Sequence, residues 1–378
     1  MCNHGRKETE TLGTGTDAVV VVYPGRDPGP EHERITHQEL ARRIARLQNL
    51  EFGGEYVPGK YHRPLYLVPR ESITTLSEAQ KLGINDEQDL FGGVVPYPFV
   101  ASKAISHPLV SASATAPEGW VRDFAEEVRD AVLPGFTAFS LADAYTAGLR
   151  LLDLGPVRVK TVRATAGRGQ ARISTSDELS HYLDCQDQSE IANHGLVLEQ
   201  HLEDLTTFSV GQVRLGKLTV SYYGTQRLTR DNSGEEVYGG SDLTVARGNF
   251  DALLALDLAA DAKLAVAQAQ QYDRAANTCY QDFFASRRNY DIARGAAPGG
   301  DTRSGVLEQS WRIGGASSAE IAALEAFQAD PSLAAICTSS LEVFGAHVQV
   351  PPEAEILYQG EDPDLGYMTK CVITRPYG

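Results

Sequence analysis

Three groups of residues in this chain have the types and the order that phosphate chemistry requires. In the first, Lys160 lies in the β-branched stretch 157–162 and precedes a segment that contains Gly167, Arg168 and Gly169. Glycines let backbone amides approach phosphate oxygens closely, and a lysine neutralises phosphate charge, so a hairpin of this kind can fold over a triphosphate. An ordinary hairpin with a solvated lysine and a glycine turn would have the same pattern.

The second group belongs to the apolar stretch 195–202, in which a predicted strand ends at Glu199 and the chain then crosses over at Gln200 to Leu202. Backbone groups at such a crossing can read one edge of an adenine ring, and a carboxylate at Glu203 can hold ribose hydroxyls. A strand that simply ends in solvated acidic residues is the alternative interpretation of this segment.

The third group is a pair of acidic residues on two predicted strands, Asp291 within 289–295 and Glu308 within 305–311. The strands are close enough in sequence to be hairpin partners, which would point both carboxylates into one cleft. Magnesium takes such hard oxygen ligands and shares them with substrate phosphates. Arg312, four residues after Glu308, is placed to contact an anionic substrate or a phosphate in transfer. Taken as isolated residues, the two acids would also be ordinary surface residues.

The elements that would position these groups begin with a βαβ pattern. The apolar run 17–25 is typical of a buried parallel strand, and 64–70 predicts a second strand. Between them, 35–50 predicts a helix, in which Thr36 and Glu39 form a capping box.

The rest of the chain changes from helical to strand patterns near Gly155, a plausible helix C-cap followed by proline. The predicted parts are, in order, a strand leading toward a helix near Ser102 that carries Lys103 (90–110), a helical connection (111–155), a small α+β unit (156–203), antiparallel strands (from 206), an alanine- and leucine-rich helix (about 252–286) and a short mixed tail (346–378).

The composition limits the partners of the chain. It has 378 residues, 42% of them hydrophobic and 22% charged, which is typical of a soluble globular protein with two or three subdomains. The formal net charge of -16 argues against nucleic acid and against anionic membranes, because the field of the protein would repel both. A few local lysines and backbone amides can still hold the phosphates of a nucleotide.

Cysteine usage and hydropathy bear on the compartment. The five cysteines form no CxxC pair and no zinc-type cluster with histidine, so reduced thiols are expected. No stretch approaches 18 apolar residues, and the N-terminal segment lacks the apolar core of a signal peptide. We therefore expect a cytoplasmic protein, with a homodimer as the default assembly.

The order of the parts resembles the ATP-grasp superfamily, the fold of D-alanine ligase, biotin carboxylase and glutathione synthetase. A lysine–glycine hairpin, a helix, a strand ending in glutamate, an antiparallel sheet and paired acids followed by arginine carry this resemblance over roughly 90–345. The match is most similar to an uncharacterised bacterial family within the superfamily. It implies an α/β (α+β) fold with a Rossmann-like N-terminal domain (1–110), a helical connection (111–155), a lid subdomain (156–203), a catalytic C-terminal domain with an antiparallel sheet (204–345) and a tail (346–378).

The resemblance also implies residue roles, which follow the order of the motifs along the chain. The implied set is Lys103 and Lys160 on the ATP phosphates, Gly167, Arg168 and Gly169 covering them, Glu199 and Leu202 at the adenine hinge, Glu203 near the ribose, Asp291, Glu308 and Ser310 on Mg²⁺, and Arg312 facing the acyl phosphate or substrate. Asp282 is the alternative first metal ligand. Asp291 is preferred because a strand and a turn connect it directly to Glu308.

Two positions depart from the family pattern. The family usually has Glu-x-Asn at the second metal site, whereas this chain has Glu308, Gln309 and Ser310, and a serine hydroxyl coordinates more weakly. Biotin carboxylase places a glutamate eight residues beyond the metal glutamate, and Ala316 occupies that position here. Carboxylation of biotin is therefore disfavoured.

The activity that the resemblance implies is an ATP- and Mg²⁺-dependent carboxylate–amine (or thiol) ligase. A small-molecule carboxylate would attack the γ-phosphoryl group, and an amine or thiol would capture the acyl phosphate, releasing ADP and phosphate. Lys160 and Arg312 would be the catalytic residues, through charge neutralisation and alignment. His107, His181, His194 and His201 are available as bases, and nothing in the sequence selects one of them.

Two alternatives remain open at the level of sequence. One is a nucleotide-binding protein without catalysis, in which Ser310 marks a degraded metal site. The other is a doubly wound α/β protein that uses a different small ligand.

Overall fold

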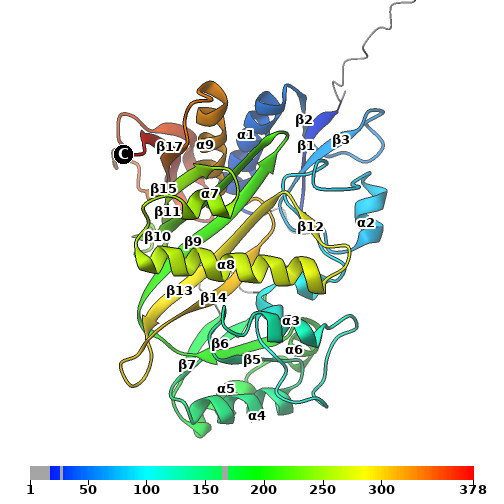
Figure 1. Ribbon diagram of the computed structural model, residues 1–378, viewed down its shortest axis with the longest axis vertical. Helices are drawn as coiled ribbons and strands as arrows, with labels where there is room; N and C mark the ends of the chain where they lie inside the picture. Colours follow the sequence, from blue (N-terminus) through cyan, green and yellow to red (C-terminus); the bar gives the residue numbers. More distant parts are fainter. Residues whose placement is uncertain (1–17, 26–28, 164–168) are drawn as a thin grey trace, which may run out of the picture.

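The computed structural model describes residues 18–25, 29–163 and 169–378. Figure 1 shows three parts, with a small parallel sheet and its helices at the upper right, a large twisted sheet in the centre and a compact lid at the bottom. None of the helices in the described part of the chain combines the length and the hydropathy that a membrane crossing requires.

The N-terminal part is built on the predicted βαβ pattern. Its three parallel strands have the order β2-β1-β3, so the predicted strands are neighbours and an unpredicted one lies at the edge. The strands are β1 (Val19–Tyr23), β2 (Glu51–Glu55) and β3 (Leu65–Pro69), and the helices are α1 (Glu31–Gln48) and α2 (Leu76–Lys81).

The predicted capping box at Thr36 and Glu39 is wrong. Helix α1 begins at Glu31, so both residues lie inside it, and Pro30 holds the N-cap position. The Thr36 hydroxyl instead donates to the carbonyl oxygen of His32, 2.7 Å away. This bond within the helix competes with the capping role.

The lid is a four-stranded antiparallel sheet of order β5-β8-β6-β7. Its first strand and the helix that follows come from 111–155, which was predicted as a helical connection. The lid elements are β5 (Gly135–Ala138), α4 (Leu141–Leu152), β6 (Val157–Thr161), β7 (Gln170–Ile173), α5 (Ser176–Asp184), α6 (Gln188–His194) and β8 (Leu196–Gln200).

The central sheet has eight antiparallel strands in the order β14-β13-β9-β10-β11-β15-β17-β16. The predicted tail, 346–378, contributes its last two strands and is therefore part of the sheet. The strands are β9 (Glu203–Leu215), β10 (Leu218–Arg230), β11 (Glu236–Arg247), β13 (Arg287–Ala296), β14 (Thr302–Ser310), β15 (Ala335–Phe344), β16 (Glu355–Asp362) and β17 (Gly366–Pro376).

The helix predicted at about 252–286 is two shorter helices, α7 (Phe250–Leu254) and α8 (Ala260–Cys279). Leu253 and Leu258 are both buried in the same core cluster, which requires the chain to turn between them. A two-residue strand, β12 (Phe284–Ala285), follows α8 and pairs with the equally short β4 (Gly93–Val94) in a separate sheet.

The two faces of the central sheet pack against different helices. On one face α8 and α3 (Arg122–Glu127) cover side chains that include Tyr290, and on the other α9 (Ser317–Ala329) and α1 cover side chains that include Tyr222. Because side chains alternate along a strand, the residues beside Tyr290 point away from α8. Those residues carry the candidate chemistry.

Candidate nucleotide and metal site

The two predicted metal carboxylates lie opposite each other on neighbouring strands. Asp291 of β13 is the register partner of Glu308 of β14, as the hairpin interpretation predicted. The Asp291 carboxylate accepts hydrogen bonds from the side-chain amides of Gln226, at 2.9 Å, and Asn289, at 3.1 Å. Burial and the negative charge of Glu308 together raise the pKa of Asp291 to about 6, against these hydrogen bonds.

Lys103 forms an ion pair with Glu308, with 2.9 Å between the ammonium and the carboxylate. It begins the 3₁₀ helix η2 (Lys103–Ser106), which follows Ser102 as its N-cap, close to where the sequence predicted a helix start. Gln309 fixes this arrangement, because its amide donates to the carbonyl oxygens of Val100, at 2.8 Å, and Ser102, at 2.7 Å. The neighbour of Glu308 on β14 thus holds the segment that presents the lysine.

A second cluster, buried in the lid, contains Lys160, Glu199 and His107. The Lys160 ammonium is 2.5 Å from one oxygen of Glu199, and the His107 ring is 3.3 Å from the other. Burial acts to raise the pKa of Glu199, but the charges and hydrogen bonds of Lys160 and His107 outweigh it and hold that pKa at about 2. Glu199 is therefore an anion with a dedicated cation in the absence of any ligand.

One short segment joins the two clusters. Helix η2 packs against β14 on one side and against β5 and β8 of the lid on the other. Lys103 at its start contacts Glu308, and His107, directly after its end, contacts Glu199. The predicted phosphate and metal residues from four distant parts of the chain are thereby drawn to one region between lid and sheet.

The chain crossing proposed for adenine lies between the last lid strand, β8, and the first long strand of the central sheet, β9. Gln200 donates its backbone amide to the carbonyl of Pro134, at 2.8 Å, and His201 donates to that of Pro156, at 2.9 Å. Leu202 is buried, whereas Glu203 is exposed at the start of β9. The Glu203 carboxylate lies 3.6 Å from Arg172 of the lid.

A small apolar cluster lies beside this crossing. Leu133, Leu202, Ala293 and Ala297 are buried together, and the partly buried Leu307 packs against them. Ala293 and Leu307 adjoin the carboxylate pair along β13 and β14. Sequence reasoning missed this cluster, because its members are ordinary apolar residues that only the folded chain brings together.

The predicted glycine cover is described only at its end. Gly167 and Arg168 lie outside the described residues. Gly169 has φ of +62°, which glycine adopts without strain, and its carbonyl accepts the backbone amide of Thr161 at 3.1 Å. The turn that follows Lys160 is thus closed by a hydrogen bond to β6.

Ser310 is already in contact with a cation. Its hydroxyl accepts a hydrogen bond from Arg287, at 3.2 Å, and the same guanidinium donates to the backbone carbonyl of Arg312 at 2.7 Å. A positive charge against this oxygen opposes its use as a metal ligand. Arg312 is itself largely buried, and burial and the charge of Arg287 lower its pKa.

Asp282, the alternative first metal ligand, differs from Asp291 in its surroundings. It lies exposed in the turn before β12, with φ of +68°, and not on the strand that faces Glu308. Ala316, at the position of the biotin carboxylase glutamate, is buried just before α9.

Asp291 and Glu308 supply too few ligands to hold a magnesium ion by themselves, but they fit an ion that a substrate phosphate also coordinates. No group of three or more His, Cys, Asp and Glu side chains in the described ranges is arranged to hold a metal. Two facing carboxylates, one with a pKa raised by burial and by the charge of the other, are the usual protein share of a magnesium site completed by substrate phosphates. The two buried lysines and the apolar cluster fit a nucleotide in the same way.

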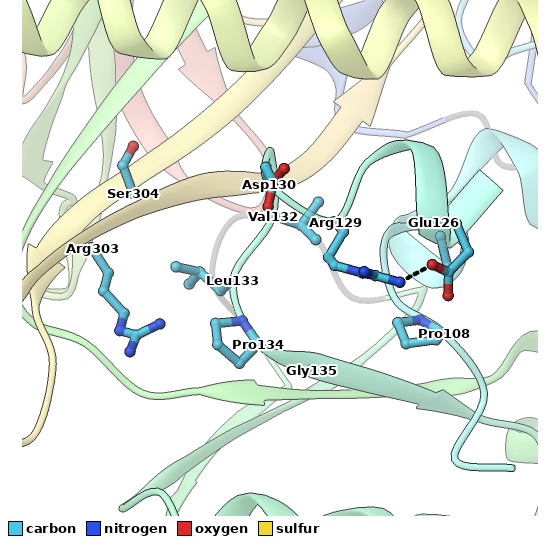
Figure 2. A pocket seen from close by; sticks show the side chains of 11 residues that line it. Pro108, Glu126, Arg129, Asp130, Val132, Leu133, Pro134, Gly135, Arg303 and Ser304 are labelled. Atoms are coloured by element: carbon cyan, nitrogen blue, oxygen red, sulfur yellow. Dashed lines mark hydrogen bonds and ion pairs between the residues drawn. The ribbon is translucent and has the colours of Figure 1, made fainter. Parts of the chain in front are cut away.

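The cavity of Figure 2 adjoins the apolar cluster at Leu133, but neither Asp291 nor Glu308 lines it. It has a volume of about 500 Å³ and is lined by the segment 132–135, Arg129, Glu126 and the start of β14. Ser304 in its wall donates to Gln268 of α8, at 2.7 Å, so this wall faces α8 rather than the carboxylate side. The figure shows Arg129 bonded to Glu126 rather than directed at the site.

The comparisons with known proteins identify the family. A family model described as "Protein of unknown function (DUF3182)" matches residues 20–372. The chain belongs to this family. Comparison with curated proteins gave no match.

Solved structures identify the fold. Biotin carboxylase from Campylobacter jejuni, in complex with β,γ-ATP, is 10% identical with a TM-score of 0.50, over 94% of this chain and 87% of that one. N5-carboxyaminoimidazole synthase from Aspergillus clavatus, in complex with ADP and 5-aminoimidazole ribonucleotide, is 13% identical (TM-score 0.49, 95% and 94% covered). Phosphoribosylamine–glycine ligase from Thermotoga maritima is 12% identical (TM-score 0.49, 94% and 92% covered).

The fold is one that ATP-grasp enzymes have, so the prediction of the fold class is confirmed. The small lid sheet, the large antiparallel sheet and the parallel N-terminal sheet are the parts that the resemblance implied.

Proposed function

We propose that this protein is an ATP- and Mg²⁺-dependent ligase. In this proposal it activates a small-molecule carboxylate as an acyl phosphate for attack by an amine or thiol, and releases ADP and phosphate. The observation that supports it best is the segment 103–107, which places Lys103 on Glu308 and His107 on Glu199. It draws a cationic lid site and a carboxylate pair toward each other, as phosphoryl transfer from a bound nucleotide requires.

The residues divide into a base end and a phosphate end. The partly buried Leu307, which packs on the buried Leu202 and Ala293, offers apolar contact for the adenine ring. The exposed Glu203 would exchange its contact with Arg172 for the ribose hydroxyls. Lys160 and Lys103 neutralise phosphate charge on the two sides of the cleft, with the glycine segment 167–169 over the phosphates. When a nucleotide binds, the lysines exchange part of their contact with Glu199 and Glu308 for phosphate oxygens.

Asp291 and Glu308 are the proposed Mg²⁺ ligands, with Ser310 as a weaker third. A bound Mg²⁺ would neutralise charge on the transferring phosphoryl group. Arg312 directs its charge toward the acyl phosphate or the carboxylate substrate. No side-chain nucleophile is required, because the substrate carboxylate itself attacks the γ-phosphorus and the ADP oxygen leaves.

Phosphate release tests this proposal. Purified protein with ATP and Mg²⁺ is incubated with a panel of small carboxylic acids and amino acids, and phosphate is measured. We expect release that depends on one carboxylate, and its loss in Glu308→Gln with ADP binding retained. Nucleotide binding without turnover across a broad panel would contradict ligation.

A non-catalytic nucleotide-binding protein is the second candidate, and one observation favours it. The Ser310 hydroxyl, which replaces the amide of the family pattern, is held by Arg287 at 3.2 Å. Under this candidate, ADP binds equally well with and without Mg²⁺ and no variant has turnover to lose. Under the first, Mg²⁺ strengthens binding of the nucleotide.

A further inference from the structure

Helix α9 carries a glutamate, Glu320, among side chains that are otherwise packed in the apolar core. Glu320 is 0% exposed, and its helical neighbours Ile321, Ala323 and Leu324 are buried with it. A buried carboxylate is costly unless it is paired and hydrogen-bonded. The sequence analysis assigned no role to this residue.

Glu320 is paired with a buried arginine on the strand of the metal carboxylate. The Arg287 guanidinium lies 2.6 Å from one oxygen of Glu320, and its Nε lies 3.1 Å from both. The pair joins α9 to β13, four residues before Asp291. Both side chains are buried, and the proposed nucleotide reaction assigns no role to this ion pair.

A second path leads from Glu320 to Asp291 through neutral side chains. The Tyr222 hydroxyl lies between Glu320, at 2.5 Å, and the side-chain oxygen of Asn289, at 2.8 Å, and shares its single proton between these two acceptors. Ser209 also donates to that oxygen, at 2.7 Å, which leaves the amide group of Asn289 to donate to Asp291 at 3.1 Å. The orientation of the Asn289 amide, and with it the hydrogen bond to Asp291, is therefore set by Tyr222 and Ser209.

The arginine branch reaches the other side of the site. Arg287 donates to the hydroxyl and the carbonyl of Ser310, at 3.2 and 3.1 Å, and to the carbonyl of Arg312 at 2.7 Å. One guanidinium thus fixes the end of β14 and the segment that carries Arg312. Both branches begin at Glu320.

We propose that Glu320 is a positioning residue, which holds Asp291 through Tyr222 and Asn289, and Ser310 and Arg312 through Arg287. This inference rests on the proposed function, because it concerns the same metal site. Residues that orient metal ligands act without touching the ion, and their loss typically weakens metal affinity about 10- to 100-fold. A buried charge is also hard to rearrange, so it keeps the ligands in one geometry.

The test compares two fully buried tyrosines that pack on opposite faces of the central sheet. Tyr222→Phe breaks the bridge between Glu320 and Asn289. Tyr290→Phe removes an equally buried hydroxyl, bonded to Asp273 at 2.6 Å on the α8 face. The measurement is Mn²⁺ affinity in the presence of ADP by electron paramagnetic resonance, together with ADP affinity in chelator and urea denaturation of each variant.

We expect Tyr222→Phe to weaken Mn²⁺ binding about tenfold and leave ADP binding in chelator within about twofold, while Tyr290→Phe changes neither. Glu320→Gln, which keeps the shape but not the charge, should weaken Mn²⁺ binding at least as much. Equal Mn²⁺ affinity in Tyr222→Phe and Tyr290→Phe would overturn the inference and leave the proposed function standing. If the wild-type protein binds no Mn²⁺ beside ADP, the proposed function fails and the inference with it.

Discussion

Asp291 and Glu308 face each other, but only one of them has a cation of its own. Lys103 pairs with Glu308, whereas Asp291 receives only neutral amide donors from Gln226 and Asn289. Burial and, after it, the charge of Glu308 raise the pKa of Asp291 to about 6. A divalent cation is the ligand that would relieve the repulsion between the two carboxylates.

The first prediction follows from the sign of this shift. The folded-state pKa of Asp291, about 6, lies above the reference value of 3.8, so the folded chain binds the proton more tightly and loses stability as pH rises from about 4 to about 6. Without metal at pH 7.5, Asp291→Asn should therefore raise the free energy of unfolding by about 3 kcal/mol, and by only about 1 kcal/mol at pH 4.5. Urea denaturation at the two pH values measures this. A variant that is less stable than the wild type at pH 7.5 would contradict it.

The second prediction concerns the buried pair of Lys160 and Glu199. Removing the lysine leaves a buried anion with only His107 beside it, and breaking such a pair costs about 3 kcal/mol. Lys160→Met should therefore be destabilised by about that amount, whereas Lys160→Met combined with Glu199→Gln should recover most of the loss. Urea denaturation of the two single variants and the double variant gives the coupling free energy. Additive effects would mean that the two side chains are not coupled.

For single residues, the sequence predicted the contacts between side chains on the same hairpin or strand. Asp291 and Glu308 could be paired because one turn joins their strands, and Asp291 could be preferred to Asp282 for the same reason. His107 could not be assigned to Glu199, because 92 residues separate them. The pairing of Arg287 with Glu320 was equally hidden, since it depends on how α9 packs against the sheet.

Among the elements, the segment 131–133, which leads into the first lid strand, packs its backbone tightly against β14 and forms the hinge between lid and central sheet. Gly305 on β14 lies against the hinge, and a Cβ there would come within 2.5 Å of the backbone nitrogen of Leu133 and 2.6 Å of the carbonyl carbon of Val132. The amide of Val306 donates to the carbonyl of Ala131 at 2.8 Å. The lid is therefore anchored to the strand that carries Glu308.

The third prediction uses this contact. Gly305→Ala forces the hinge away from β14, which should destabilise the protein by about 2 kcal/mol and weaken nucleotide binding, because Lys160 moves with the lid. Gly360→Ala on β16, where a Cβ would meet only the Tyr358 ring at 3.5 Å or more, is the matched control. It should change stability by no more than about 0.5 kcal/mol. Urea denaturation and ADP titration compare the two, and equal behaviour would exclude a structural role for the hinge contact.

Element types were predictable where one periodicity was strong, and their partners were not. The strand at 17–25 was correct because its apolar run had one interpretation. The lid boundary was wrong because β5 is only four residues long and pairs with β8, far along the chain. The tail 346–378 joined the central sheet because β17 pairs with β15, a partner that no local pattern reveals.

For the whole molecule, the charge of -16 and the proposed ligand oppose each other. A nucleotide carries several negative charges, so its binding depends on local cations rather than on the overall field. Lys103 and Lys160 are both buried and both paired with carboxylates, which keeps two positive charges inside an acidic protein. The fold could be predicted from the order of motifs, whereas the substrate could not, because its pocket has no motif in the sequence.

The central claim is that the cleft between lid and central sheet binds a nucleotide with a divalent cation. Isothermal titration calorimetry of ADP into the wild-type protein, with Mg²⁺ and then with chelator, tests it most directly. We predict one site per chain, with tighter binding in Mg²⁺ than in chelator. No saturable heat up to about 1 mM ADP, which corresponds to a binding free energy weaker than about 4 kcal/mol, would contradict the account.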